Sequence, residues 1–152
     1  MTGHSFEDFK VGDCFETEGV TLTEAAIIDF AFRFDPQPFH IDSQAACRSP
    51  YGGLIASGLQ TLALTFRLFR DTGVITGTSH GEAGADEVRW LRPVRPGDTV
   101  RVKVTVAGLL PSRRIERGTV RLAYATLNQH GEVVMTMSVN HLIQRHPRPE
   151  SP

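Results

Sequence analysis

Apolar and polar side chains alternate along the second half of the chain, which is the pattern of strands with one buried face. Valine occupies every second position at 100–106, the alternation returns at 120–124 and 133–143, and 87–94 predicts a shorter strand. His141 lies on the apolar face of the last strand, which predicts a hydrogen-bonded histidine in the core or at an interface. Four consecutive strands are therefore expected.

The first half of the chain has a helical pattern instead. A short strand is predicted at 16–21, and Thr23 with Glu24 predicts the start of a helix that continues to Phe34. A second helix begins at Gly58, with so few polar positions that we expect it to be buried on most of its circumference. Helices gathered before strands predict an α+β domain, with one curved antiparallel sheet wrapped around the second helix.

Composition is consistent with one ordinary globular domain. The chain has 152 residues, 40% of them hydrophobic, and we expect a single domain at 1–146 followed by a frayed, proline-rich tail at 147–152. The formal charge of -1, with interspersed signs, gives no basic stripe for nucleic acid and no polybasic patch for a membrane surface. Neither class of partner is expected.

The termini and cysteines bear on cellular location. Residues 1–10 lack the apolar core of a signal peptide, and no apolar run approaches the roughly 20 residues that cross a bilayer. Cys14 and Cys47 form no CxxC pair, so we expect two buried thiols rather than a disulfide framework. A cytoplasmic location follows as an expectation.

A carboxylate and an imidazole lie five residues apart, at Asp35 and His40, around two prolines. On a helix this spacing rotates the side chains by roughly 140°, and on a strand it puts them on opposite faces. Pro36 and Pro38 favour a bent loop that can bring the two together as a general acid and base. The alternative is that Asp35 only ends a helix and His40 only fills a partly buried gap.

Three segments, taken in order, resemble the MaoC-like dehydratase family. They are DPQPFHID at 35–42, YGGLIASG at 51–58 and WLRPVRPGD at 90–98, and the resemblance extends over nearly the whole chain. It implies a hot-dog fold and an (R)-specific enoyl-CoA hydratase or 3-hydroxyacyl-thioester dehydratase, with no cofactor and no metal. It also implies a homodimer, which could pair into dimers of dimers, and a substrate carried by CoA or an acyl-carrier protein.

The resemblance places the family's catalytic aspartate on Asp35 and its histidine on His40. The chain departs from the commoner motif at two positions, with Gln37 in place of asparagine and Ser57 in place of histidine. We interpret both departures as marks of a subgroup, and they leave the acyl group of the substrate open.

Hydration of an enoyl thioester requires an activated water and donors for the negative charge on the thioester oxygen. We expect Asp35 to be the proton acceptor and His40 to orient the water. Backbone amides at a helix start can supply the donors, so Gly58 is the first candidate, with Ser57 and Gly53 beside it. The alternative for the glycines is turn geometry and tight helix packing.

Further side chains are weaker candidates for contacts with the substrate. Four arginines could bind the phosphates of an acyl carrier, although surface arginines are usually solvated: Arg67, Arg70, Arg113 and Arg114. Trp90 and the segment 74–85 are candidates to shape the acyl pocket, although a tryptophan on an apolar strand is more often in the core.

Two other functions remain open alternatives. A hot-dog thioesterase usually needs a carboxylate on or beside the central helix, yet 58–70 contains none and Asp71 comes only at its far end. A non-catalytic subunit that binds acyl thioesters would keep the fold without turnover, and intact Asp35 and His40 argue against it.

Overall fold

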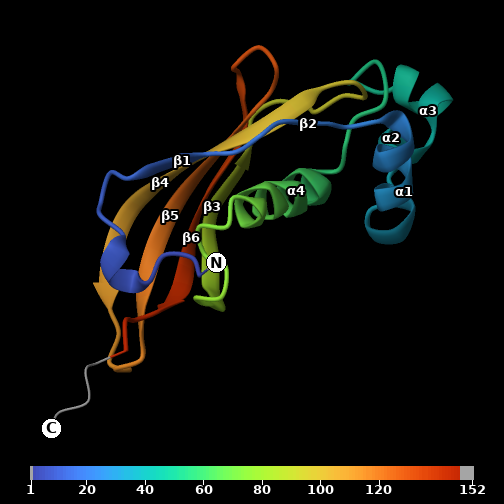
Figure 1. Cartoon of the computed structure of the whole chain (residues 1–152). Helices are drawn as coiled ribbons and strands as arrows, with labels where there is room; N and C mark the ends of the chain where they lie inside the picture. The colour runs from blue at the N-terminus through green and yellow to red at the C-terminus, as the bar shows by residue number, and fades with distance from the viewer. Residues whose placement is uncertain (1, 148–152) are drawn as a thin grey trace, which may run out of the picture.

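The protein is built on a six-stranded antiparallel sheet that curls around one helix (Figure 1). The computed structural model describes residues 2–147, so the predicted tail at 147–152 lies almost wholly outside the described residues. The strands are β1 (Cys14–Glu16), β2 (Val20–Thr21), β3 (Ser79–Trp90), β4 (Thr99–Pro111), β5 (Arg117–Leu127) and β6 (Val133–Gln144). The helices are the 3-10 turn η1 (Phe6–Asp8), α1 (Glu24–Phe34), α2 (Pro38–Ile41), α3 (Ser43–Cys47) and α4 (Gly58–Asp71). The predicted α+β hot-dog architecture is confirmed.

The sheet has the order β1-β4-β5-β6-β3, with β2 pairing beside β1 on β4. On β5 every second residue is buried, and Val120, Leu122 and Tyr124 are at most 2% exposed. These positions and the valines of β4 pack in one core with Phe69 of α4, which is fully buried. The alternation seen in the sequence therefore marks the face of the sheet that holds α4.

Helix α4 is buried on one face only, so the expectation of burial around most of its circumference is wrong. Its buried residues are Thr61, Thr65, Leu68 and Phe69, whereas Leu59 is 49% exposed. The physical reason is that the sheet covers one side of the helix in a single chain, as Figure 1 shows.

Strand β3 begins at Ser79, eight positions earlier than the predicted start at 87, and ends at Trp90 instead of 94. Within residues 2–147 it is an edge strand that pairs only with β6, and most of its residues are exposed on both faces. Alternation could not reveal its first half for that reason. The predicted strand at 16–21 is likewise two short strands, β1 and β2, separated at 17–19.

Both cysteines are free and exposed, so the expectation that Cys14 and Cys47 are buried thiols is wrong. Cys14 begins β1 at the sheet edge, and Cys47 ends the short helix α3 on the surface. Within residues 2–147, none of the helices is both long and apolar enough to cross a bilayer.

Candidate active site

Asp35 and His40 are placed by the segment α1 to α3, which stands beyond the sheet next to the start of α4 (Figure 1). Thr23 caps α1 by accepting a hydrogen bond from the Ala26 amide at 3.1 Å, and Asp35 is the residue at which the helix ends. The predicted bent loop is in part a four-residue helix, because Pro38 occupies the first position of α2, where a proline fits. His40 lies within this turn.

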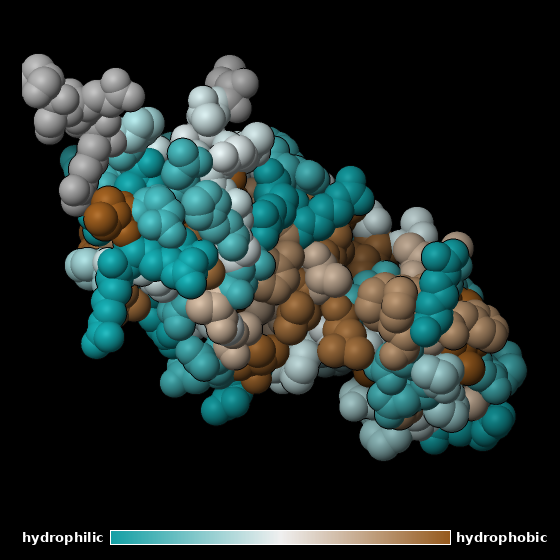
Figure 2. Space-filling model, turned by 90° about the horizontal axis from the view of Figure 1, so that it is seen from below, coloured by the Kyte–Doolittle hydropathy of each residue, from teal (hydrophilic) through white to brown (hydrophobic). Residues whose placement is uncertain are grey.

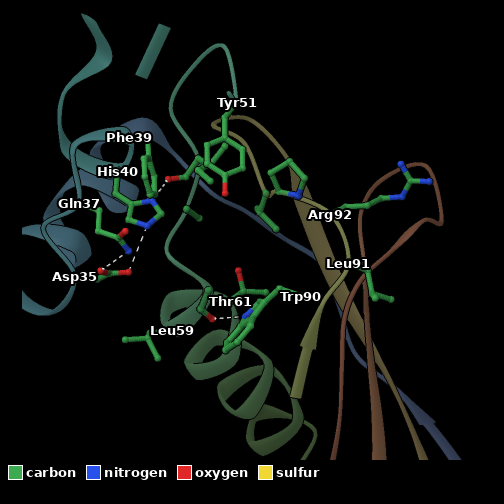
Figure 3. Close-up of a pocket in the computed structure, with 15 residues that line it drawn as sticks. Asp35, Gln37, Phe39, His40, Tyr51, Leu59, Thr61, Trp90, Leu91 and Arg92 are labelled. Carbon is green, nitrogen blue, oxygen red and sulfur yellow. Dashed lines mark hydrogen bonds and ion pairs between the residues drawn. The ribbon is translucent and has the colours of Figure 1, made fainter. Parts of the chain in front are cut away.

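The structure brings the two side chains together. Nε2 of His40 lies 3.3 Å from Oδ2 of Asp35, and His40 is only 3% exposed (Figure 3). Nδ1 of His40 lies 2.7 Å from the carbonyl oxygen of Ile55, which can only accept a hydrogen bond. Nδ1 therefore carries a hydrogen, and in the neutral ring Nε2 is the nitrogen that can take up a proton next to Asp35.

Two further donors hold the Asp35 carboxylate. The Ser57 hydroxyl donates to Oδ2 at 2.7 Å, and the Gln37 amide donates to Oδ1 at 2.9 Å. The Ser57 hydrogen bond is the main reason that the pKa of Asp35 lies below its ordinary value; partial burial opposes this, and the Gln37 hydrogen bond and the neighbouring His40 ring add to it. Asp35 is therefore held as a carboxylate.

The hydrogen bonds of Ser57 differ from the sequence expectation. Its hydroxyl proton points to Asp35, while its oxygen accepts from the Leu59 amide at 3.2 Å as the cap of α4. A hydroxyl engaged in this way has no second proton for a thioester oxygen. In this structure Ser57 positions Asp35, and the expected role as an extra oxyanion donor has no support.

Across from the pair, the first turn of α4 and the end of β3 complete a cavity of about 540 Å³ (Figure 3). Its lining includes Asp35, Gln37, His40, Gly58, Trp90 and Val94. The molecule narrows between the sheet and the α1 to α3 segment, and apolar residues gather there in the space-filling view (Figure 2). The site is thus a mostly apolar cleft with a small polar group at one wall, as ligand pockets usually are.

Gly58 faces this cavity as the first residue of the 14-residue helix α4. Within the described part of the chain, its amide donates no hydrogen bond, so it is available to a ligand at the positive end of the helix dipole. A Cβ on Gly58 would lie 2.6 Å from Nε1 of Trp90. The alternative interpretation was turn geometry and tight helix packing, and this close contact of the helix start with Trp90 is sufficient to explain the glycine.

The expected phosphate-binding arginines lie away from the cavity. Arg67 is on the exposed side of α4, where it pairs with Asp71 at 3.4 Å. Arg113 and Arg114 belong to the turn between β4 and β5, at the end of the sheet remote from α1 to α3 (Figure 1). Gly53 lies in the turn between α3 and α4 and is not part of the cavity lining. The structure does not bring these four residues to the Asp35 pair.

Two other arginines are nearer. Arg92 lines the cavity and pairs with Glu132 at 3.1 Å, and Arg95 donates to the carbonyl oxygen of Tyr51 at 2.7 Å. Both belong to the segment 90–98, which is one of the three segments that carry the family resemblance. That membership was the signal that could have identified them. Arg92 and Arg95 are the basic groups at this site that sequence reasoning missed.

Trp90 is not a core residue, since it is 52% exposed and lines the cavity. The segment 74–85, its expected companion, contributes nothing to this lining.

His141 lies in the core, fully buried, with Nε2 2.7 Å from the Tyr124 hydroxyl, which confirms the expectation of a hydrogen-bonded histidine. Burial, and secondarily the charge of Arg70, lower the pKa of His141 to about 4.

Comparisons with known proteins agree with this geometry. The family model described as MaoC like domain matches residues 8–127. A MaoC-like dehydratase from Rhodospirillum rubrum of known crystal structure is 42% identical, with a TM-score of 0.86 over 95% of this chain and 99% of that one. The uncharacterized protein YdeM of Bacillus subtilis is 32% identical over 144 residues, which are 91% of this chain and 98% of that protein.

A third relative carries a named activity. The 3-hydroxybutyryl-CoA dehydratase of Methylorubrum extorquens is 35% identical over 117 residues, which cover 74% of this chain and 69% of that protein. The family match covers most of the chain and includes Asp35, His40 and the start of α4. With the hot-dog fold and the paired aspartate and histidine beside a helix start, this chain belongs to the MaoC-like dehydratase family.

Proposed function

We propose that this protein is a hydro-lyase that adds water across the trans-2 double bond of an enoyl thioester and catalyses the reverse dehydration. The product would be the (R)-3-hydroxyacyl thioester, as for the (R)-specific enoyl-CoA hydratase of R. rubrum, which is 30% identical over 116 residues. One observation carries the proposal. His40, whose Nε2 is paired with Asp35, and Gly58, whose amide donates no hydrogen bond within residues 2–147, line the same cavity.

In the proposed reaction, the thioester oxygen accepts a hydrogen bond from the Gly58 amide. Water held at the Asp35 and His40 pair attacks C3, and its proton passes to the pair as negative charge develops on the thioester oxygen. The same proton is then delivered to C2, so that the C2–H bond forms and the pair returns to its starting state. Water is consumed, the double bond is lost and the thioester stays intact.

The contacts of Asp35 suggest how the pair shares this work. A carboxylate with a lowered pKa is a weaker base, and Ser57 and Gln37 already donate to it. Nε2 of His40 is therefore the better proton acceptor, and the Asp35 carboxylate stabilises the cation that results. This assignment reverses the sequence expectation, in which Asp35 accepted the proton.

Thioester hydrolysis has less support. A carboxylate would be needed on α4 next to the bound thioester, but Asp71 ends the helix at the opposite end from Gly58 and pairs with Arg67.

For the acyl carrier, whether CoA or an acyl-carrier protein, we propose Arg92 and Arg95 as the groups that meet its phosphates, because both lie next to the cavity.

We also propose that two copies associate as the expected homodimer. The 12-residue strand β3 forms one edge of the sheet, and its outer backbone groups have no partner strand within residues 2–147. Leu59 and Leu91 expose 49% and 57% of their surface close to that edge. A second copy would cover both the open strand edge and the exposed leucines. The cytoplasmic location is a separate prediction.

A direct assay distinguishes the candidate functions. Crotonyl-CoA is mixed with the purified protein, the conjugated double bond is followed by ultraviolet absorbance, and free thiol is followed with a disulfide reagent. We expect absorbance to fall without release of thiol. Thiol release with the double bond intact would indicate a thioesterase, and binding without either reaction would indicate a non-catalytic acyl-thioester binder.

A further inference from the structure

Trp90 closes one side of the cavity, opposite the Asp35 and His40 pair (Figure 3). Its indole Nε1 donates to the carbonyl oxygen of Gly58 at 2.9 Å, and the ring occupies the space that a side chain at position 58 would need. The indole is therefore attached to the same residue whose amide faces the thioester in the proposed reaction.

The position of Trp90 is fixed by the backbone as well. It is the last residue of β3 and pairs in register with Met135 of β6, which is fully buried. Directly after it, the Leu91 amide donates to the carbonyl oxygen of Val134 at 2.8 Å. A ring held at its backbone and at its indole nitrogen loses little further freedom when a ligand binds, and it resists displacement.

Beyond Thr61, helix α4 packs directly against the sheet. Thr61 is the deepest α4 residue that lines the cavity. One turn further along the helix, the hydroxyls of Thr65 and Thr126 lie 2.6 Å apart, and these residues are 0% and 1% exposed. An acyl chain that enters past Gly58 therefore meets Trp90 on one side and a closed, hydrogen-bonded contact below Thr61.

We propose that Trp90 is a specificity-determining residue, and that it restricts the substrate to short-chain enoyl thioesters. This inference rests on the proposed function and adds the acyl class, which the motifs left open. The aromatic wall excludes longer chains by its bulk, and its hydrogen bond to Gly58 keeps that bulk beside the reacting carbons.

The test compares kcat/KM for crotonyl-CoA and trans-2-octenoyl-CoA in the full-length protein. The wild type is expected to prefer crotonyl-CoA, and Trp90→Ala is expected to raise the octenoyl-to-crotonyl ratio at least about tenfold. Trp90→Phe keeps an aromatic wall but lacks the hydrogen bond to Gly58, so its ratio should lie between those of the wild type and Trp90→Ala. Leu110→Ala, at an exposed position on β4, is the control for a loss of apolar volume elsewhere.

A measurement without turnover keeps the inference testable if Trp90→Ala folds poorly. Calorimetric titration of wild type and Trp90→Phe with saturated butyryl-CoA and octanoyl-CoA should show tighter binding of the shorter ligand to both. Equal or tighter binding of octanoyl-CoA, or an unchanged ratio in Trp90→Ala, would overturn the role of Trp90 while hydration itself stood. Failure of the wild type to hydrate any enoyl-CoA would overturn the proposed function and this inference together.

Discussion

Replacement of Ser57 by alanine tests how the polar wall of the site operates. The hydroxyl makes two contacts, a 2.7 Å hydrogen bond to Oδ2 of Asp35 and a 3.2 Å hydrogen bond from the Leu59 amide that caps α4. Ser57 is fully buried, so water cannot easily replace the missing hydroxyl. The variant removes a helix cap and the main support of the Asp35 carboxylate at the same time.

The two losses have separable sizes. Loss of the cap should lower the free energy of unfolding by about 1 kcal/mol. A hydrogen bond to a charged group contributes about 1.5 to 3 kcal/mol, which corresponds to roughly a ten- to hundredfold lower kcat/KM if the carboxylate must be held in place. Because the Ser57 hydroxyl lowers the pKa of Asp35, its removal raises that pKa toward the ordinary value, and the part of the acidic limb that reflects protonation of Asp35 moves to higher pH.

The assay is the pH dependence of kcat/KM for crotonyl-CoA, with unfolding measured by chemical denaturation. Thr23→Ala is the matched control, because Thr23 caps α1 through the Ala26 amide and has no hydrogen bond to Asp35. Ser57→Ala should lose at least as much stability as Thr23→Ala, because it also loses the hydrogen bond to Asp35, and only Ser57→Ala should change the rate profile. Identical profiles in the two variants, or a shift of the acidic limb to lower pH, would refute the reasoning.

Two further predictions concern the core and the helix start. The pKa of His141 is near 6.5 in the unfolded chain and about 4 in the folded protein, so between these pH values the unfolded chain binds more protons. The free energy of unfolding should therefore fall by about 3 kcal/mol as the pH drops from 6.5 to 4. In urea unfolding, the stability of His141→Gln should depend less on pH. Gly58→Ala should cost about 1 to 3 kcal/mol through contact with Trp90, and the double variant with Trp90→Ala should unfold at a higher urea concentration than Gly58→Ala alone.

Features set by local patterns could be predicted from the sequence. Valines at every second position of β4 and the apolar positions of β6 identified strands directly, because the period of two reflects one buried face. The pairing of Asp35 with His40 could also be predicted, because their spacing of five residues and the two prolines between them favour a bend that brings the side chains together. The N-terminal start of α4 at Gly58 followed from its apolar pattern.

Features that depend on distant contacts could not be predicted. Ser57 meets Asp35 across 22 positions of sequence, and no local pattern shows that its proton points there. Arg67 was misplaced because the side of α4 that faces solvent depends on which side the sheet covers. The first half of β3 was missed because an edge strand exposed on both faces has no alternation to recognise.

The central claim is that Asp35 and His40 together add water to an enoyl thioester, and steady-state hydration of crotonyl-CoA tests it most directly. Asp35→Asn and His40→Ala should each lower kcat at least about a hundredfold, while Asp29→Asn and His80→Ala, at exposed positions, should leave it unchanged. The wild-type product should be the (R)-3-hydroxybutyryl thioester by chiral chromatography. Wild-type rates in folded Asp35→Asn and His40→Ala, or an (S) product, would contradict the account.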